Sequence, residues 1–284
     1  MKYQIVSAKP GEKLEVLPLL KFPEDFHGST QVHHLVKFGD SFVSLIGKSE
    51  AELPRDGVVI LEHHLDEAKK LMDKINALAQ QVIADSKKYD DIGFCREYFE
   101  LAKTGYRMLD KYKPKGGLPG GCPVSLERAG LVTTRLALGL DKDAVISEEQ
   151  KVVTKRTHLK DEPETNLSVT VQWRDEAKLK ELNNKEVLLS DFVNPASGSS
   201  GLAFAAAVKN LGISPMKINH RSISCTRQGV IFSRQALGEM GIKSSFMSVG
   251  ECNELNEMYY LTGNRAVADA GHMLRHFLPK WYKM

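Results

Sequence analysis

The most constraining feature of this sequence is the alternation of strand-like and helix-like segments that begins beyond residue 120. Short apolar runs suited to strands are followed by segments with helical spacing of about ten residues. The predicted strands lie at 123–126, 186–190, 217–219 and 244–249, and the predicted helices at 131–140, 202–210 and 234–240. Strands that alternate with helices form a mostly parallel sheet covered on both faces, and such sheets bind ligands at the carboxyl ends of their strands. The sequence therefore predicts an α/β fold.

The connection between the strand at 186–190 and the helix at 202–210 carries a motif with chemical meaning. Asp191 follows the strand directly, and its carboxylate can accept hydrogen bonds from ribose hydroxyls. A polar loop comes next, and its small residues are Ala196, Ser197, Gly198, Ser199 and Ser200. Small residues allow backbone N–H groups to converge on a phosphate, and the helix N-terminus adds a partial positive charge. A serine-rich turn that only caps a helix has a similar composition, so both interpretations stay open.

The first 113 residues follow a different pattern. Strands are predicted at 3–6, 14–17, 31–38, 41–46 and 57–61. From Asp66 onward, apolar residues recur at three- and four-residue steps, which predicts an amphipathic helix with Ile83 on its apolar face, ending between 85 and 90. A second helix is predicted over 98–109. We therefore expect a β-rich N-terminal region of unknown role at 1–62, a helical segment at 63–113 and an α/β domain at 114–284.

Composition and charge narrow the classes of partner. Hydrophobic residues make up 42% of the chain, charged residues 26%, and the formal net charge is only +3, so we expect no nucleic-acid partner. No apolar run reaches the roughly 20 residues that span a bilayer, so we expect a soluble protein without a membrane partner. The four cysteines are far apart and no secretory signal is present, which favours a cytoplasmic protein. No histidine or cysteine pattern has metal-ligand spacing, so no metal bound by the protein alone is expected.

Four further segments, taken with the polar loop, form an ordered set of motifs. In chain order they are an Arg-Ala-Gly-Leu stretch at 128–131, a Lys-Asp-Glu stretch at 160–162, the loop after Asp191, an Arg-Gln-Gly turn at 227–229, and a Leu-Asn…Ala-Asp-Ala-Gly stretch over 255–271. This set resembles the motifs of the uracil phosphoribosyltransferase family in order and in spacing. The resemblance covers residues 92–275 and implies a type I phosphoribosyltransferase fold.

The resemblance implies a role for each segment. The loop residues Ala196, Ser197, Gly198, Ser199 and Ser200 would hold the 5′-phosphate of phosphoribosyl pyrophosphate (PRPP). Asp191 would hold the ribose, Arg128 and Lys160 would face the pyrophosphate leaving group, and Mg²⁺ would bind together with PRPP. Arg128 and Lys160 suit that role because cations neutralise a departing diphosphate.

The resemblance also places the base-binding residues near the C-terminus. The base slot would be formed by Tyr260, Gly263, Arg265, Ala270 and Gly271, with Asp269 near PRPP and magnesium. The segment is longer here than in the family, so the base could differ from uracil. Asp269 is equally suited to capping a helix.

The resulting prediction is an enzyme that joins a pyrimidine base, uracil or a relative, to PRPP and releases pyrophosphate. Asp191, Arg128 and Asp269 are its predicted catalytic residues, and a homo-oligomer, most simply a dimer, is expected. Two alternatives stay open at this point. One is a module of the same fold that binds PRPP or a nucleotide without turnover, and the other is a component of a larger assembly that docks through its N-terminal region.

Overall fold

The strands that the structure describes form one ten-stranded sheet and one small hairpin. The computed structural model describes residues 15–16, 30–38, 41–49, 53, 56–112, 121–126, 129–139, 150–158, 166–173, 179–193, 195, 199–252, 254–255, 261–262 and 270–277. The strand predicted at 3–6 lies outside these residues.

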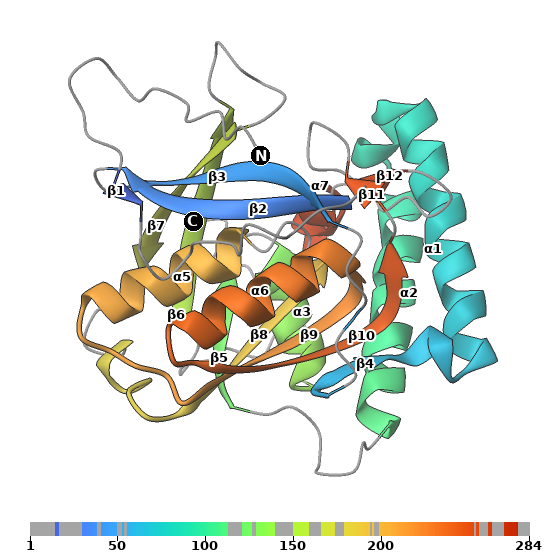
Figure 1. The fold of residues 1–284 in the computed structure, drawn as a ribbon. Helices are drawn as coiled ribbons and strands as arrows, with labels where there is room; N and C mark the ends of the chain where they lie inside the picture. Colours follow the sequence, from blue (N-terminus) through green and yellow to red (C-terminus); the bar gives the residue numbers. More distant parts are fainter. Residues whose placement is uncertain are drawn as a thin grey trace.

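A parallel block forms the larger part of the sheet (Figure 1). Its strands run in the spatial order β6 (Gln150–His158), β5 (Cys122–Leu126), β8 (Glu186–Val193), β9 (Lys217–Thr226), β10 (Lys243–Cys252) and β4 (Val58–Ile60). Beyond β6 the sheet continues antiparallel through β7 (Asn166–Trp173), β3 (Ser41–Ser49), β2 (Thr30–Phe38) and β1 (Glu15–Val16). The predicted fold class, a mostly parallel sheet with a small β-rich N-terminal region, is confirmed.

One face of the parallel block carries α1 (Asp66–Ala84), α2 (Ile92–Lys111), α3 (Ala129–Ala137) and α7 (Ala270–Leu274). Their apolar side chains share one core with Phe192, Ile223 and Val249 of the sheet. Helix α2 approaches β9 closely, because a Cβ added at Gly105 would lie 2.5 Å from Ile223 Cδ1. The sheet residues of this core therefore pack directly beneath α2.

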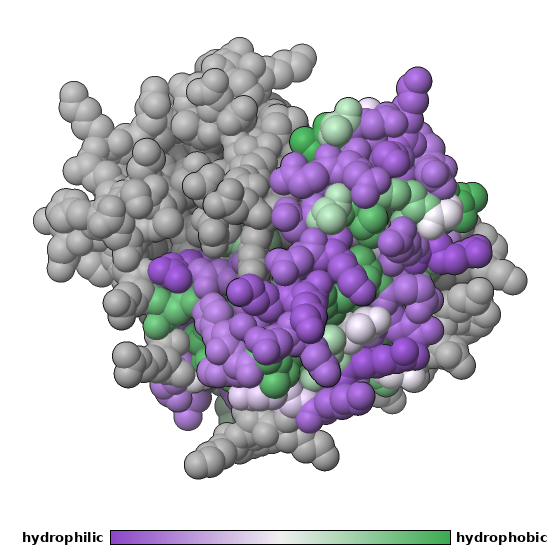
Figure 2. All heavy atoms as spheres, turned by 90° about the vertical axis from the view of Figure 1, so that its right-hand side faces the viewer, coloured by the Kyte–Doolittle hydropathy of each residue, from purple (hydrophilic) through white to green (hydrophobic). Residues whose placement is uncertain are grey.

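The periodicity of α1 and α2 explains their placement. The predicted apolar face of α1 is buried except for Ile83, which lies near the helix end and is 54% exposed. Helix α2 begins earlier than predicted, where the Asp91 carboxylate accepts the Phe94 N–H at 3.1 Å and caps the helix. The outward face of the two helices is mainly hydrophilic (Figure 2), as expected for amphipathic helices packed on a sheet.

The opposite face of the sheet carries α5 (Ser199–Asn210) and α6 (Arg227–Glu239). A second core joins Leu202 and Phe204 of α5 and Leu237 of α6 to Val187 and Ile218 of the sheet. Strand β2 contacts both helices, so the antiparallel arm passes over them (Figure 1). Both faces of the parallel block are thus covered, as the alternating pattern predicts.

Strand β9 is much longer than its predicted portion at 217–219. The prediction ended there because the following residues are polar, although the structure buries them. Polar partners compensate this burial: Asn219 Nδ2 donates to Glu186 Oε2 at 2.8 Å, and Ser245 Oγ donates to Asn219 Oδ1 at 2.5 Å. Burial lowers the pKa of His220 to about 3, so this imidazole is neutral near pH 7 and stacks on Phe246. Buried polar groups with partners can occupy a central strand, which a search for apolar runs overlooks.

Within the described ranges, no helix is both long enough and apolar enough to cross a membrane.

Candidate functional site

The candidate phosphate loop connects the carboxyl end of β8 to the N-terminus of α5 at the centre of the parallel block. Of the predicted loop residues, Ala196, Ser197 and Gly198 lie outside the described residues, and Ser199 and Ser200 form the first turn of α5. Helix α5 begins three residues before its predicted start at 202, so the unpaired N–H groups of its first turn directly follow the predicted loop in the chain. A helix N-terminus at the carboxyl edge of a parallel sheet is a suitable place for an anion.

Asp191 lies within β8, not directly after it as predicted. The strand extends to Val193 because Asp191 and Val193 pair with Ser222 and Ser224 of β9. The half-buried Asp191 side chain turns toward its own backbone, where Oδ1 accepts the Phe192 N–H at 2.6 Å. The carboxylate is therefore held at a defined position near the carboxyl end of the strand.

Tyr106 of α2 fixes the backbone of this region from below. Its fully buried hydroxyl lies 2.9 Å from Asp191 O and 3.3 Å from Arg221 O, on two neighbouring strands. Burial, and then the Asp191 carboxylate, raise the pKa of Tyr106, so the hydroxyl keeps its proton and remains a donor. The sequence placed Tyr106 only on an apolar helix face, and no local signal indicates its contacts with residues 85 and 115 positions away.

The Arg-Ala-Gly-Leu stretch brings α3 against β8. Arg128 itself lies outside the described residues, and Ala129, Gly130 and Leu131 form the first turn of α3. A Cβ added at Gly130 would lie 3.2 Å from Ser190 O, and Thr133 Oγ1 donates to the same oxygen at 3.2 Å. A glycine at this position therefore allows the helix to start directly beside the residue that precedes Asp191.

The carboxyl end of β9 lies against the same loop. Thr226 N–H donates to Pro195 O at 2.9 Å, and Thr226 Oγ1 accepts the Gly229 N–H at 3.0 Å, which caps α6. The predicted turn at 227–229 is therefore wrong, because these residues form the first turn of α6. The Thr226 contacts hold the start of α6 beside the candidate phosphate loop.

The predicted base slot is described only in part. Tyr260, Gly263, Arg265 and Asp269 lie outside the described residues. Ala270 and Gly271 begin α7, which contacts α2 and α3. Two segments of the motif set, the starts of α3 and α7, therefore belong to neighbouring helices on one face of the sheet.

Lys160 also lies outside the described residues, between the antiparallel strands β6 and β7. Among the residues that the structure describes, no group of three or more His, Cys, Asp or Glu side chains could hold a metal ion. The roles of Lys160 and of Mg²⁺ stay predictions.

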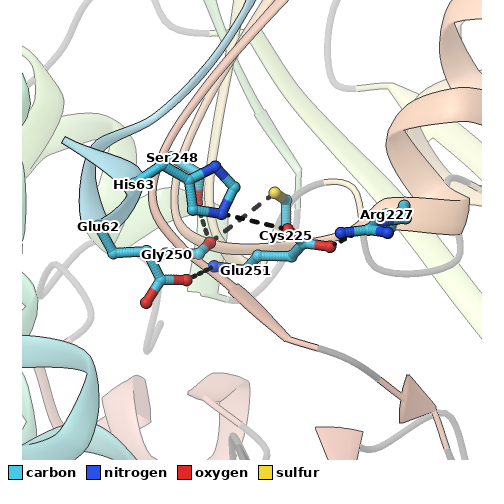
Figure 3. A network of polar contacts seen from close by, with 7 residues as sticks. All are labelled: Glu62, His63, Cys225, Arg227, Ser248, Gly250 and Glu251. Atoms are coloured by element: carbon cyan, nitrogen blue, oxygen red, sulfur yellow. Dashed lines mark hydrogen bonds and ion pairs between the residues drawn. The ribbon is translucent and has the colours of Figure 1, made fainter. Parts of the chain in front are cut away.

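A polar network at the β4 side of the sheet was not expected from the sequence (Figure 3). Its centre is the buried Glu251, near the end of β10, whose Oε1 accepts Arg227 Nε at 2.9 Å and whose Oε2 lies 3.5 Å from His63 Nε2. The Glu251 N–H donates to Glu62 Oε1 at 2.6 Å. Burial, and then Glu251, raise the pKa of the neighbouring Cys225 thiol, so this cysteine is not activated as a nucleophile.

Comparisons with known proteins identify a structure with the same fold but assign no family. No family model and no curated protein sequence matches the chain. The AQ2163 protein from Aquifex aeolicus superimposes with a TM-score of 0.50 at 16% identity, over 76% of this chain and 97% of that chain. An adenine phosphoribosyltransferase from Trypanosoma brucei, solved with AMP, pyrophosphate and ribose-5-phosphate, has a TM-score of 0.35 at 15% identity, over 61% of this chain and 71% of that chain. The superposition on the Aquifex protein shows that the two chains share a fold. The superposition on the adenine phosphoribosyltransferase is too distant to show one.

Proposed function

We propose that the protein is a phosphoribosyltransferase that joins a pyrimidine base, uracil or a relative, to PRPP and releases pyrophosphate. The observation that carries the proposal is the connection from β8 to α5. It places an anchored carboxylate, Asp191, and the N-terminus of a long helix at the carboxyl edge of a parallel sheet, with a loop of small residues between them. The resemblance of the five motif segments to the uracil phosphoribosyltransferase family supports the same function.

The chemistry follows from what these residue types can do. A ring nitrogen of the base forms a bond to C1 of the ribose and gives up its proton to solvent, while the bond from C1 to the pyrophosphate oxygen breaks and its electron pair leaves with pyrophosphate. The loop from Ala196 to Ser200 would hold the 5′-phosphate, and Asp191 would orient the ribose hydroxyls. Arg128 and Lys160 would neutralise the charge that develops on the leaving group. Mg²⁺ that enters with PRPP would neutralise part of the same charge.

No covalent intermediate on the protein is required. The thiols of Cys225 and Cys252 are buried, and burial raises the pKa of Cys252 to about 12. In this proposal the protein contributes by positioning PRPP and base and by electrostatic stabilisation, which can account for a large part of an enzymatic rate enhancement.

A second candidate function uses the same site. A module that binds PRPP or a nucleotide without turnover would keep the phosphate loop and Asp191 but would not need a working base slot. The longer segment before Gly271 favours this candidate, because that segment is the one assigned to the base.

Replacement of Asp191 tests the proposal. We expect Asp191→Asn to lower pyrophosphate release from PRPP by more than about 100-fold while the free energy of unfolding changes by less than about 1 kcal/mol. Glu181→Gln, which removes an exposed carboxylate near the amino end of the same strand, is the matched control and should leave the rate unchanged. An Asp191→Asn variant with the rate of the natural protein would exclude Asp191 from the site.

A further inference from the structure

The first turn of α5 packs directly on a row of three residues from neighbouring strands. Leu189 of β8 pairs with His220 of β9, and His220 pairs with Phe246 of β10. A Cβ added at Gly201, the third residue of α5, would lie 3.4 Å from His220 Cε1 and 3.6 Å from Leu189 Cδ1. Both are ordinary contact distances for a single methyl group, so the space beneath Gly201 admits one carbon but not a branched side chain. The first turn of α5 therefore rests on the His220 ring.

His220 is itself held firmly and carries no charge. Only 1% of the residue is exposed, and its ring stacks on Phe246 with the ring centroids 4.5 Å apart and 14° between the ring planes. Burial lowers the pKa of His220 to about 3, so the ring is neutral near pH 7. A neutral and buried ring makes no ion pair with a phosphate. His220 can therefore influence a ligand only through the position of α5.

The next row toward the carboxyl edge, on the same face of the sheet, is polar. Side chains alternate along a strand, so Asp191 shares the face of Leu189, and Ser222 shares the face of His220. Asp191 and Ser222 pair with each other. Because β8 and β9 are parallel, the helix that connects them runs from the carboxyl edge back toward the amino edge, and its N-terminus faces this polar row. The free N–H groups of the first turn and the Asp191 carboxylate are thus directed to the same region.

The other end of the candidate phosphate loop is also held by β9. Thr226 N–H donates to Pro195 O at 2.9 Å, and only residues 196–198 separate Pro195 from Ser199, the first residue of α5. Three residues between two held ends have little slack, because each residue spans only about 3.5 Å of chain. A shift of the first turn of α5 would therefore change the loop as well.

We infer that His220 is a positioning residue for phosphate binding: its contact with Gly201 sets the height of the first turn of α5 above the sheet, and thereby the position of the N–H groups that hold the phosphate. His220 does not touch the ligand in this inference. The inference rests on the proposed function, because it assigns the phosphate of a phosphoribosyl ligand to this helix N-terminus. The contact acts through shape, so a change of size on either side of it should alter phosphate binding.

The test enlarges one side of the contact. Gly201→Val adds branches for which His220 and Leu189 leave no room, so we expect the Kd for ribose 5-phosphate, measured by titration calorimetry, to rise about tenfold. Gly201→Ala adds one methyl at an ordinary contact distance and should change this Kd less than about twofold. Gly238→Val is the matched control. Gly238 is also a helical glycine, in α6, but a Cβ added there would have no atom of the described residues within 4 Å, so the Kd should not change.

A double substitution shows whether the contact is direct. We expect Gly201→Val to bind ribose 5-phosphate more tightly when it is combined with His220→Ala, because the shorter side chain makes room for the valine. Loss of folded protein lowers the number of binding sites in the titration and leaves the Kd unchanged, so it differs from a positioning defect. An unchanged Kd in Gly201→Val, or a double variant in which the two single effects simply multiply, would overturn the inference.

Binding and turnover separate this inference from the proposed function. Ribose 5-phosphate carries the phosphate and the ribose but no leaving group, so its binding requires no reaction. If the natural protein binds it, the variants respond as expected and no base releases pyrophosphate from PRPP, the proposed function fails and the positioning role stands. If pyrophosphate is released but Gly201→Val binds ribose 5-phosphate as tightly as the natural protein, the positioning role fails and the proposed function stands. A natural protein that does not bind ribose 5-phosphate would also overturn the inference.

Discussion

The carboxyl edge of the parallel sheet is held differently at its centre and at its β4 side. At the centre, Tyr106 and Thr133 donate to the main-chain oxygens of β8 and β9, and the Arg221 guanidinium is buried against Asp110. At the β4 side, Glu251 is held by side chains that are about half exposed. Each place pairs a buried group with a half-exposed one, because Asp110 is 43% exposed and Arg227 is 44% exposed. The centre has in addition the buried hydroxyls of Tyr106 and Thr133, whose removal leaves buried main-chain oxygens without that donor.

This difference matches the role that we propose for the centre. The centre carries Asp191 and the phosphate loop, where a fixed geometry is required for any ligand that contains a phosphoribosyl group. Substitutions at the two places therefore test whether the centre is the more strongly held region.

The largest effect on stability is expected from Asp110→Asn. Only 5% of the Arg221 side chain is exposed, and its Nη2 lies 2.5 Å from Asp110 Oδ1. The substitution leaves a buried guanidinium without its carboxylate, but Asp110 itself is 43% exposed, so the free energy of unfolding should fall by about 2 kcal/mol in urea denaturation. Glu100→Gln, in the exposed pair with Lys103 on the same helix, is the control and should cost less than about 0.5 kcal/mol. Equal losses of stability in Asp110→Asn and Glu100→Gln would contradict the expectation that the contact of Asp110 with the buried Arg221 stabilises the centre of the sheet.

A smaller effect is expected from Tyr106→Phe. The substitution removes the hydroxyl near Asp191 O and Arg221 O and should lower the free energy of unfolding by about 1–2 kcal/mol. Burial raises the pKa of Tyr106, so the hydroxyl stays protonated and the difference should be constant between about pH 6 and pH 9. Tyr112→Phe at the end of the same helix serves as the control. A loss that appears only at high pH would show that the Tyr106 contact depends on ionisation.

The smallest effect is expected from Arg227→Gln at the β4 side. The buried Glu251 keeps His63 Nε2 at 3.5 Å from its second oxygen when Arg227 is replaced, and the glutamine amide can still donate to it, so the substitution should cost less than about 1 kcal/mol. Unfolding measured at about 0.05 M and 1 M NaCl should show a smaller difference at the higher concentration, because salt screens exposed charges. The Tyr106→Phe difference should not change with salt. A large, salt-independent effect at Arg227 would remove the distinction between the two regions.

The sequence predicted the parallel block well where strands are apolar and helices amphipathic. The strands at 123–126, 186–190 and 244–249 and the helices α1 and α2 follow directly from side-chain spacing. Strand β9 was predicted only over its first three residues, because His220 and Arg221, which follow them, are polar and their partners lie on other elements. Hydrophobic periodicity indicates which apolar side chains are buried. It cannot indicate that a polar side chain is buried against a partner far away in the sequence.

The site was predictable only where it is local in sequence. Asp191, the small residues after it and the helix that follows form one continuous segment, so their grouping is visible in the chain. Tyr106 contributes through contacts with residues 85 and 115 positions away, which no motif encodes. The roles of Arg128, Lys160 and Asp269 stay predictions, because these residues lie outside the described residues.

The most direct test of the proposed function is pyrophosphate release from PRPP in the presence of Mg²⁺ and a panel of free bases that includes uracil. We expect release with one pyrimidine base, together with an equal amount of the corresponding nucleoside monophosphate. Folded protein that binds PRPP but releases no pyrophosphate with any base would contradict it, and would leave the binding module as the function of this site.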